Sequence, residues 1–157
     1  MRFITPEIIN SMNDVEGETE AFEKLWNERM DSLQNNFAEI KEKLPANVVS
    51  FYENHTLLGC PVFSRCSNYK TEEYFFVIGK QAEDRILFIS YDCPTIPEIN
   101  QQSGLGFSSE EPAVWLYDEF HMVKDYYEHH IIFSDGMSFV IPFRSFYLRT
   151  CKWFIEN

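Results

Sequence analysis

The sequence has few glycines and prolines and no long apolar run, which excludes several large protein classes. It has 6 glycines and 7 prolines in 157 residues, which excludes collagen-like and linker-like chains. No apolar run approaches the ~20 residues that a membrane-spanning helix needs, and the N-terminus lacks the apolar stretch of a signal peptide. We therefore expect a cytoplasmic protein with no membrane partner, folded as a single domain over residues 1–157.

Basic residues are also few. There are 13 lysines and arginines against 25 acidic residues, so the formal net charge is −12. A surface that binds phosphates needs a basic face, and the 113–157 segment carries six acidic residues but only four basic ones. We therefore predict no nucleic-acid partner.

Closely spaced cysteine pairs are absent. No CxxC motif occurs among the four cysteines, Cys60, Cys66, Cys93 and Cys151. A zinc site made from cysteine needs a second close pair or a cysteine–histidine cluster. We expect four free thiols, as is usual in the cytosol. The sequence indicates no cofactor.

The abundant feature is aromatic. The chain has 26 aromatic residues (3 Trp, 8 Tyr and 15 Phe), and 20 of them lie in residues 55–157. Aromatic and β-branched residues favour strands, so this region is predicted to be β-rich. Hydrophobic residues make up 45% of the chain and charged residues 24%, which is typical of a globular domain.

Residues 1–54 are predicted to form a helical N-terminal layer of about three helices. Thr5-Pro6 is a typical helix start, and predicts a short helix to about Asn13. A long second helix is expected over residues 18–43, and Pro45 begins a third that ends near Asn54.

The long helix carries one apolar seam. Its members are spaced alternately by four and three residues: Trp26, Met30, Leu33, Phe37, Ile40 and Leu44. The seam favours packing on the rest of the domain. The alternative is a dimeric coiled coil, which wants three to four heptads. The oligomeric state, monomer or homodimer, therefore stays open.

The β-rich portion divides at turn signals. The expected strands cover residues 57–66, 73–80, 85–92, 113–123, 127–133 and 137–142, with 145–154 as a candidate last strand. Residues 93–112, with three prolines and two glycines, are expected to form a long loop. No βαβ rhythm is present. We therefore predict an α+β fold: N-terminal helices, the second long, on a mostly antiparallel sheet or partly open barrel of about six strands.

The strand patterns also assign the aromatic residues. Phe75, Phe88, Phe133 and Phe139 are expected in the core. Trp115 and Tyr117 occupy alternate positions of the 113–123 strand. They either form a binding surface or pack beneath the N-terminal helices.

Three C-terminal segments carry a resemblance. The three motifs are WLYDEF at Trp115–Phe120, YEHHIIFSDG at Tyr127–Gly136 and FVIPF at Phe139–Phe143. They resemble an uncharacterised bacterial cytosolic family, a domain of unknown function. The resemblance implies the order of the elements and a bacterial source, and brings no activity. Near the first strand the family has a Leu-His-Asp motif, whereas this chain has Leu57-Leu58-Gly59-Cys60.

The same region holds the best candidate for chemistry. It contains Asp118, Glu119, His121, Glu128, His129 and His130. If the turn is Lys124–Tyr126, His121 lies opposite His129 and shares a face with Glu119. Two imidazoles and a carboxylate could hold a metal or support acid–base chemistry. The plainer interpretation is a half-exposed polar sheet face, and a slip of one residue removes the pairing.

Two function classes follow. The first is a non-catalytic acidic binding module whose partner is another protein, such as an immunity-like protein that neutralises a basic toxin or nuclease, since negative charge steers such encounters. The alternative is a small enzyme or metal-binding protein that uses Glu119, His121 and His129.

Overall fold

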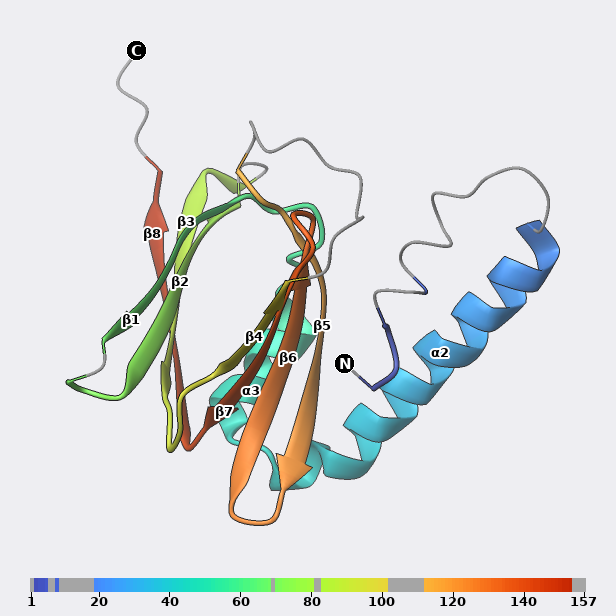
Figure 1. Cartoon of the computed structure of the whole chain (residues 1–157), viewed down its shortest axis with the longest axis horizontal. Coiled ribbons are helices and arrows are strands. Elements are labelled where there is room, and N and C mark those ends of the chain that lie inside the picture. Colours follow the sequence, from blue (N-terminus) through green and yellow to red (C-terminus); the bar gives the residue numbers. More distant parts are fainter. Residues whose placement is uncertain are drawn as a thin grey trace.

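The chain folds into two four-stranded antiparallel sheets that face each other, with helices beside them (Figure 1). A computed structural model describes residues 2–5, 8, 19–68, 70–80, 83–101 and 112–153.

The chain crosses from one sheet to the other at only a few points, so most consecutive strands lie in the same sheet. The first sheet has the order β1-β2-β3-β8 and the second has the order β4-β7-β6-β5. Their bounds are β1 Val62–Asn68, β2 Glu73–Lys80, β3 Arg85–Asp92, β4 Glu98–Gln101, β5 Trp115–Val123, β6 Tyr126–Phe133, β7 Met137–Phe143 and β8 Ser145–Lys152. All neighbouring pairs are antiparallel.

Two α-helices precede the strands in the described part of the chain. Helix α2 covers Thr19–Ile40 and continues as a short 3-10 helix, η1, over Lys41–Lys43. Pro45 separates this helix from helix α3, Ala46–Asn54. A proline has no amide hydrogen, so it cannot make the backbone hydrogen bond that would continue the earlier helix. The predicted helix at 6–13 lies outside the described residues, apart from Ile8. Neither described helix is long and apolar enough to cross a membrane.

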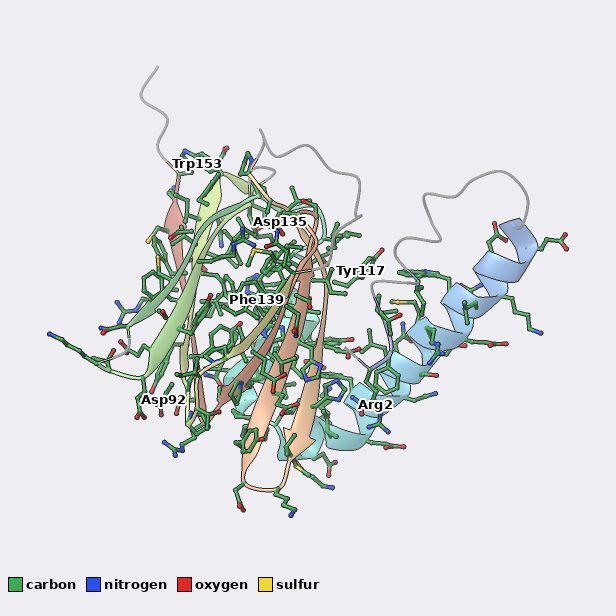
Figure 2. The ribbon with its side chains drawn as sticks, viewed as in Figure 1. Arg2, Asp92, Tyr117, Asp135, Phe139 and Trp153 are labelled. Atoms are coloured by element: carbon green, nitrogen blue, oxygen red, sulfur yellow. The ribbon has the colours of Figure 1, made fainter. Side chains whose placement is uncertain are left out.

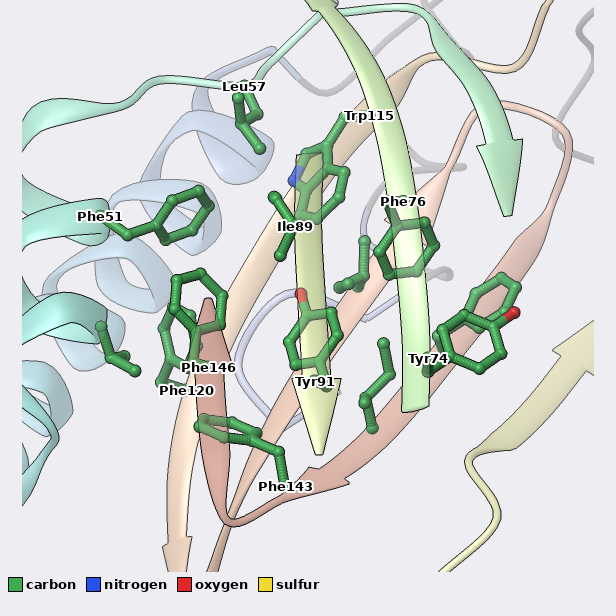
Figure 3. Close-up of a cluster of buried hydrophobic side chains, with 14 of the residues drawn as sticks. Phe51, Leu57, Tyr74, Phe76, Ile89, Tyr91, Trp115, Phe120, Phe143 and Phe146 are labelled. Carbon is green, nitrogen blue, oxygen red and sulfur yellow. The ribbon is translucent and has the colours of Figure 1, made fainter. Parts of the chain in front are cut away.

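Aromatic side chains fill the space between the sheets (Figure 3). Phe76 of β2 is fully buried and contacts the rings of Trp115, Phe133 and Phe139 from the facing sheet at 5.7–5.8 Å between centroids. Most of these contacts are edge-on or tilted, the arrangements that aromatic rings prefer. The facing sheets are therefore joined mainly by aromatic packing.

Helix α3 closes a gap between the sheets. Phe51, from its buried side, contacts Phe120 of β5 and Phe146 of β8. The side-chain amide of Asn47 donates a hydrogen bond to the Phe146 carbonyl oxygen, which ties the helix to the edge strand β8. This helix therefore belongs to the main core.

Helix α2 lies on the outer face of the second sheet, with the N-terminal residues 2–5 between them (Figures 1 and 2). Its apolar seam packs there. Leu33 joins Ile4 and Ile132 in a second buried cluster, with Trp26 and Met30 partly buried against it. The seam predicted from the sequence is thus covered by the chain itself.

The two sheets are also connected at one corner. Pro61 forms an isolated antiparallel bridge with Val114, and the Gly59 amide donates to the Trp115 carbonyl oxygen at 2.8 Å. This bridge brings the start of β1 to the start of β5 and helps to place Trp115 between the sheets.

The predicted fold was wrong in its sheet arrangement. We predicted about three helices on one sheet or partly open barrel of about six strands. The described residues instead form two helices and eight strands in two sheets. The strands at 73–80 and 85–92 are confirmed. Strand β4 lies inside the segment predicted to be a loop, where four exposed residues pair with β7 and leave no apolar alternation to detect.

The predicted core aromatics also divide. Phe133 and Phe139 are buried as predicted, with 0% and 1% of their surface exposed. Phe88 is 39% exposed and Phe75 is only half-buried. Both point to the outer face of the first sheet, since their neighbours Phe76 and Ile89 point inward.

Phe133→Ala and Phe88→Ala test this division. We expect the first to lower the free energy of unfolding by about 3–5 kcal/mol, because it leaves a cavity in the core. The second removes an exposed ring and should cost less than about 1 kcal/mol. Urea denaturation of both variants and the wild type measures the difference. Equal losses would contradict the assignment of the two faces.

Candidate functional site

The β5–β6 hairpin carries the predicted site residues, and its register decides where they lie. Val123 pairs with Tyr126, so the turn is the two residues Lys124 and Asp125. Lys124 has a φ of 30°, in the left-handed region that two-residue hairpin turns use. The three-residue turn predicted from the sequence was wrong, and the pairs from Val123 back to Tyr117 are shifted by one residue.

This shift exchanges the two adjacent histidines. His121 lies opposite Glu128, not opposite His129, and Glu119 lies opposite His130. Since successive side chains alternate between faces, His130 shares the outer face with Glu119 and His121. His129 points into the core and is fully buried. The structure therefore brings together two of the three predicted site residues and separates the third from them.

The register also shifts between Trp115 and Tyr117, where the pairing with β6 is irregular. Trp115 points inward and has no exposed surface. Tyr117 is half-buried on the outer face, where its ring meets that of Trp26 edge-on at 5.1 Å. The predicted binding surface of Trp115 and Tyr117 is therefore corrected: one lies between the sheets and the other lies under helix α2.

A hydrogen-bonded polar chain crosses the core. The Trp115 indole donates to Asp118 Oδ1 at 3.0 Å, and His129 Nε2 lies 2.9 Å from Asp118 Oδ2. His129 Nδ1 lies 2.8 Å from the Tyr91 hydroxyl. His129 can donate a hydrogen bond to the Asp118 carboxylate through Nε2 while its Nδ1 accepts the hydrogen bond of the Tyr91 hydroxyl. All side-chain polar atoms of Tyr91, Trp115, Asp118 and His129 then have hydrogen-bond partners.

Burial controls the electrostatics of this chain. It lowers the pKa of His129, and the hydrogen bond to Asp118 opposes that shift only in part. Burial also raises the pKa of Tyr91 well above its usual value. Tyr91, Trp115 and His129 have no exposed surface. Buried, directional hydrogen bonds of this kind favour one packing of the core.

A second polar group lies on the outer face of the same hairpin. The carboxylate of Glu119 is completely buried and accepts hydrogen bonds from the backbone amides of Arg2 and Phe3, the latter at 3.1 Å. His121 Nε2 lies 3.1 Å from Glu119 Oε1, and the His121 ring stacks against Phe3. The N-terminal segment therefore forms a cover over the carboxylate.

Neighbouring charges complete this group. Burial would raise the pKa of Glu119, but the hydrogen bonds from His121 and the two amides outweigh it, so the pKa is lowered. Burial lowers the pKa of His130, although its hydrogen bond to Glu128 at 2.8 Å opposes the shift. Glu119 is thus held ionised in a site where His130 resists protonation.

Three contributors to these groups were not found from the sequence. Tyr91 and the amides of Arg2 and Phe3 come from segments far from the hairpin, and no local pattern links them to it. The selection of His129 in place of His130 depended on the turn length, and Lys-Asp is not a strong two-residue turn signal.

A cavity of about 460 Å³ lies beside the predicted 93–112 loop, between the β1–β2 hairpin and residues 93–99. Arg65 lines it, forms an ion pair with Asp135 at 2.7 Å, and keeps one buried guanidinium nitrogen, Nη1, without a hydrogen-bond partner. Burial raises the pKa of Cys93 in its wall to about 11, so this thiol stays protonated. All four cysteines are free, as predicted.

A scan against protein-family models gave no match, and a search of curated proteins gave none. The resemblance of the hairpin words to a bacterial family therefore stays a prediction.

Tyr91→Phe tests the polar chain in the core. The change leaves His129 Nδ1 buried without a donor, which should lower the free energy of unfolding by about 1–3 kcal/mol. Tyr147→Phe, at a residue 56% exposed, is the matched control and should change it by less than about 0.5 kcal/mol. Urea denaturation gives both values, and an unchanged Tyr91→Phe variant would contradict the network.

The lowered pKa of His129 predicts the pH dependence of stability. An unfolded histidine takes up its proton near pH 6.5, before the folded one does, so acid favours the unfolded state. The free energy of unfolding should be constant between about pH 7 and pH 8 and fall below about pH 6.5, by up to about 1.4 kcal/mol per pH unit for each such histidine.

The lowered pKa of His130 adds to this loss in the same direction. Glu119 acts in a different window, because its lowered pKa means that its contribution is lost only below about pH 4.3. Urea denaturation at pH 8, 7, 6 and 5 isolates the histidines. A free energy of unfolding that stays level or rises from pH 7 to pH 5 would contradict the lowered pKa values of the buried histidines.

Proposed function

We propose that the protein is a non-catalytic cytosolic binding module of bacterial origin that recognises a basic protein through the outer face of the β1-β2-β3-β8 sheet. The observation that carries this proposal is that large aromatic side chains lie exposed on this face. Phe63 is 42% exposed, Phe88 is 39% exposed and Tyr147 is 56% exposed. No described helix lies against the outer face of this sheet (Figure 1).

The strand register places these side chains side by side. Phe75, Ser90 and Tyr147 form one cross-strand row, and Val77, Phe88 and Arg149 form the next. All of them except Val77 line an open hollow of about 570 Å³. An apolar centre with polar neighbours is the usual arrangement of a protein–protein interface, and tyrosine and arginine are frequent in its energetic centre.

A glycine extends the aromatic surface. A Cβ atom at Gly79 would lie 2.6 Å from the Phe63 ring and 3.0 Å from the Trp153 ring. The missing side chain lets these two rings lie on the sheet, where they meet edge-on at 5.1 Å. The Phe63 and Trp153 rings therefore lie together over Gly79.

The charge of the molecule supports a basic partner. Glu73 and Asp92 form a neighbouring acidic pair on the same face, next to the row of Phe75 and Tyr147. The whole chain carries a net charge of −12. Such a surface raises the association rate of a basic protein and repels an acidic one. An immunity protein that binds a basic toxin or nuclease is one example of this class.

The two sheets differ in a way that points to this face. The outer face of the second sheet is occupied by residues 2–5 and helix α2, whose Asn36 donates to the Phe120 carbonyl oxygen. The first sheet has no equivalent cover among the described residues. Large apolar side chains exposed together commonly mark an interaction surface.

Affinity capture with matched variants tests the proposal. The full chain serves as bait for a lysate of its source organism, in parallel with a Phe88→Ser/Tyr147→Ser double variant and a Leu58→Ser control. Leu58 is 55% exposed outside this face. All three baits have the same net charge, so nonspecific attraction to basic proteins is equal among them.

We expect wild type and Leu58→Ser to retain the same partner in stoichiometric amounts. This partner should carry a positive net charge and bind more weakly as salt rises. The double variant should bind it at least tenfold more weakly, since exposed anchor residues dominate interface energies. An acidic partner, equal binding by the double variant, or a second copy of the chain as the bound protein would each contradict the proposal.

A further inference from the structure

We propose that Glu119, His121 and His130 form a binding site for a divalent transition-metal ion, with Zn²⁺ as the best fit. The site lies on the outer face of the second sheet. It is independent of the proposed partner-binding face, which lies on the other sheet and shares no residue with it.

The backbone arranges these three residues for a common ligand. Glu119 and His130 are direct partners across the β5–β6 hairpin, and His121 is two residues along β5 on the same face. One ligand atom from each residue lies within 4.8 Å of the other two. The register observed in the structure, and not the one predicted, creates this group.

The distances are close to those that zinc requires. His121 Nε2 lies 3.1 Å from Glu119 Oε1, and His130 Nδ1 lies 3.7 Å from the same oxygen. Ligand atoms at 2.0–2.2 Å from a tetrahedral Zn²⁺ are about 3.4 Å apart. Small rotations of the side chains therefore suffice to coordinate an ion.

An unpartnered nitrogen independently points to a ligand. His130 Nδ1 is buried and has no hydrogen-bond partner among the described residues. The other ring nitrogen, Nε2, is held by Glu128 at 2.8 Å. A histidine that ligates a metal commonly has a carboxylate on its second nitrogen, which sets the orientation and basicity of the ring. Glu128 is therefore a positioning residue, and Nδ1 is the free ligand atom.

The carboxylate is also held in place before any ion binds. The amides of Arg2 and Phe3 donate to Glu119, which has no exposed surface. The Phe3 ring stacks on His121 with 5.9 Å between centroids. A ligand set fixed in this way loses little side-chain entropy when it binds.

The chemistry of the donors favours zinc over calcium or magnesium. Two imidazoles and one carboxylate are a known zinc ligand set that leaves a fourth position for water, whereas calcium and magnesium prefer oxygen ligands. The ion would take the place of the hydrogen bond between His121 and Glu119, and the His121 ring would then carry its proton on Nδ1. One carboxylate then balances half of the charge of the ion.

Calorimetric titration of the full, untagged, metal-free chain with Zn²⁺ tests the site. We expect one ion per chain in the wild type, and at least tenfold weaker binding in His121→Ala and His130→Ala. His55→Ala is the matched control, because His55 lies outside the group, and it should bind as the wild type does. Glu128→Gln should weaken binding by about 10- to 100-fold, as the loss of such an orienting carboxylate does elsewhere.

Two measurements on the wild type keep the test independent of the folding of the variants. Co²⁺ should give the intense visible absorption of a four-coordinate site. Zn²⁺ should shift the ring NMR signals of His121 and His130 and leave that of His55 unchanged. The proposal is overturned if the wild type binds no Zn²⁺, if Zn²⁺ shifts His55 in place of His121 and His130, or if folded His121→Ala and His130→Ala variants bind as tightly as the wild type.

Discussion

Successive side chains of the β5–β6 hairpin point to opposite faces of one sheet, and this alternation organises both polar groups of the protein. Asp118 and His129 face the aromatic core, whereas Glu119 and His130, each the next residue in sequence, face the N-terminal segment. A two-residue turn sets the phase of the alternation. A turn one residue longer would move each of these side chains relative to its partners across the hairpin.

The core combines aromatic packing with one polar chain. Rings from both sheets and from helix α3 fill the interior, and aromatic burial gives most of the free energy that holds the sheets together. Such packing is tolerant of small changes in arrangement. The hydrogen bonds from Tyr91 to His129 and from His129 to Asp118 are directional, so they favour one alignment of the sheets over others.

The two outer sheet faces have opposite characters. Helix α2 and residues 2–5 cover the second sheet and bury Glu119, which makes a protected polar site. The first sheet leaves Phe88 and Tyr147 exposed beside an acidic pair. This contrast separates the two proposals in space: a small site for an ion beneath the N-terminal segment, and a broad surface for a basic protein on the other side of the molecule.

The sequence by itself determined the type and position of most elements. The apolar seam from Trp26 to Ile40 and the apolar alternation at 73–80 and 85–92 report local periodicity, which depends only on neighbouring residues. The tertiary structure alone decided that the strands divide into two sheets, that Phe88 is exposed, and that His130 and not His129 joins His121. These outcomes depend on strand pairing between distant segments and on the phase of each strand, and one residue in a turn or an irregularity beside Trp115 reverses that phase without changing the local pattern.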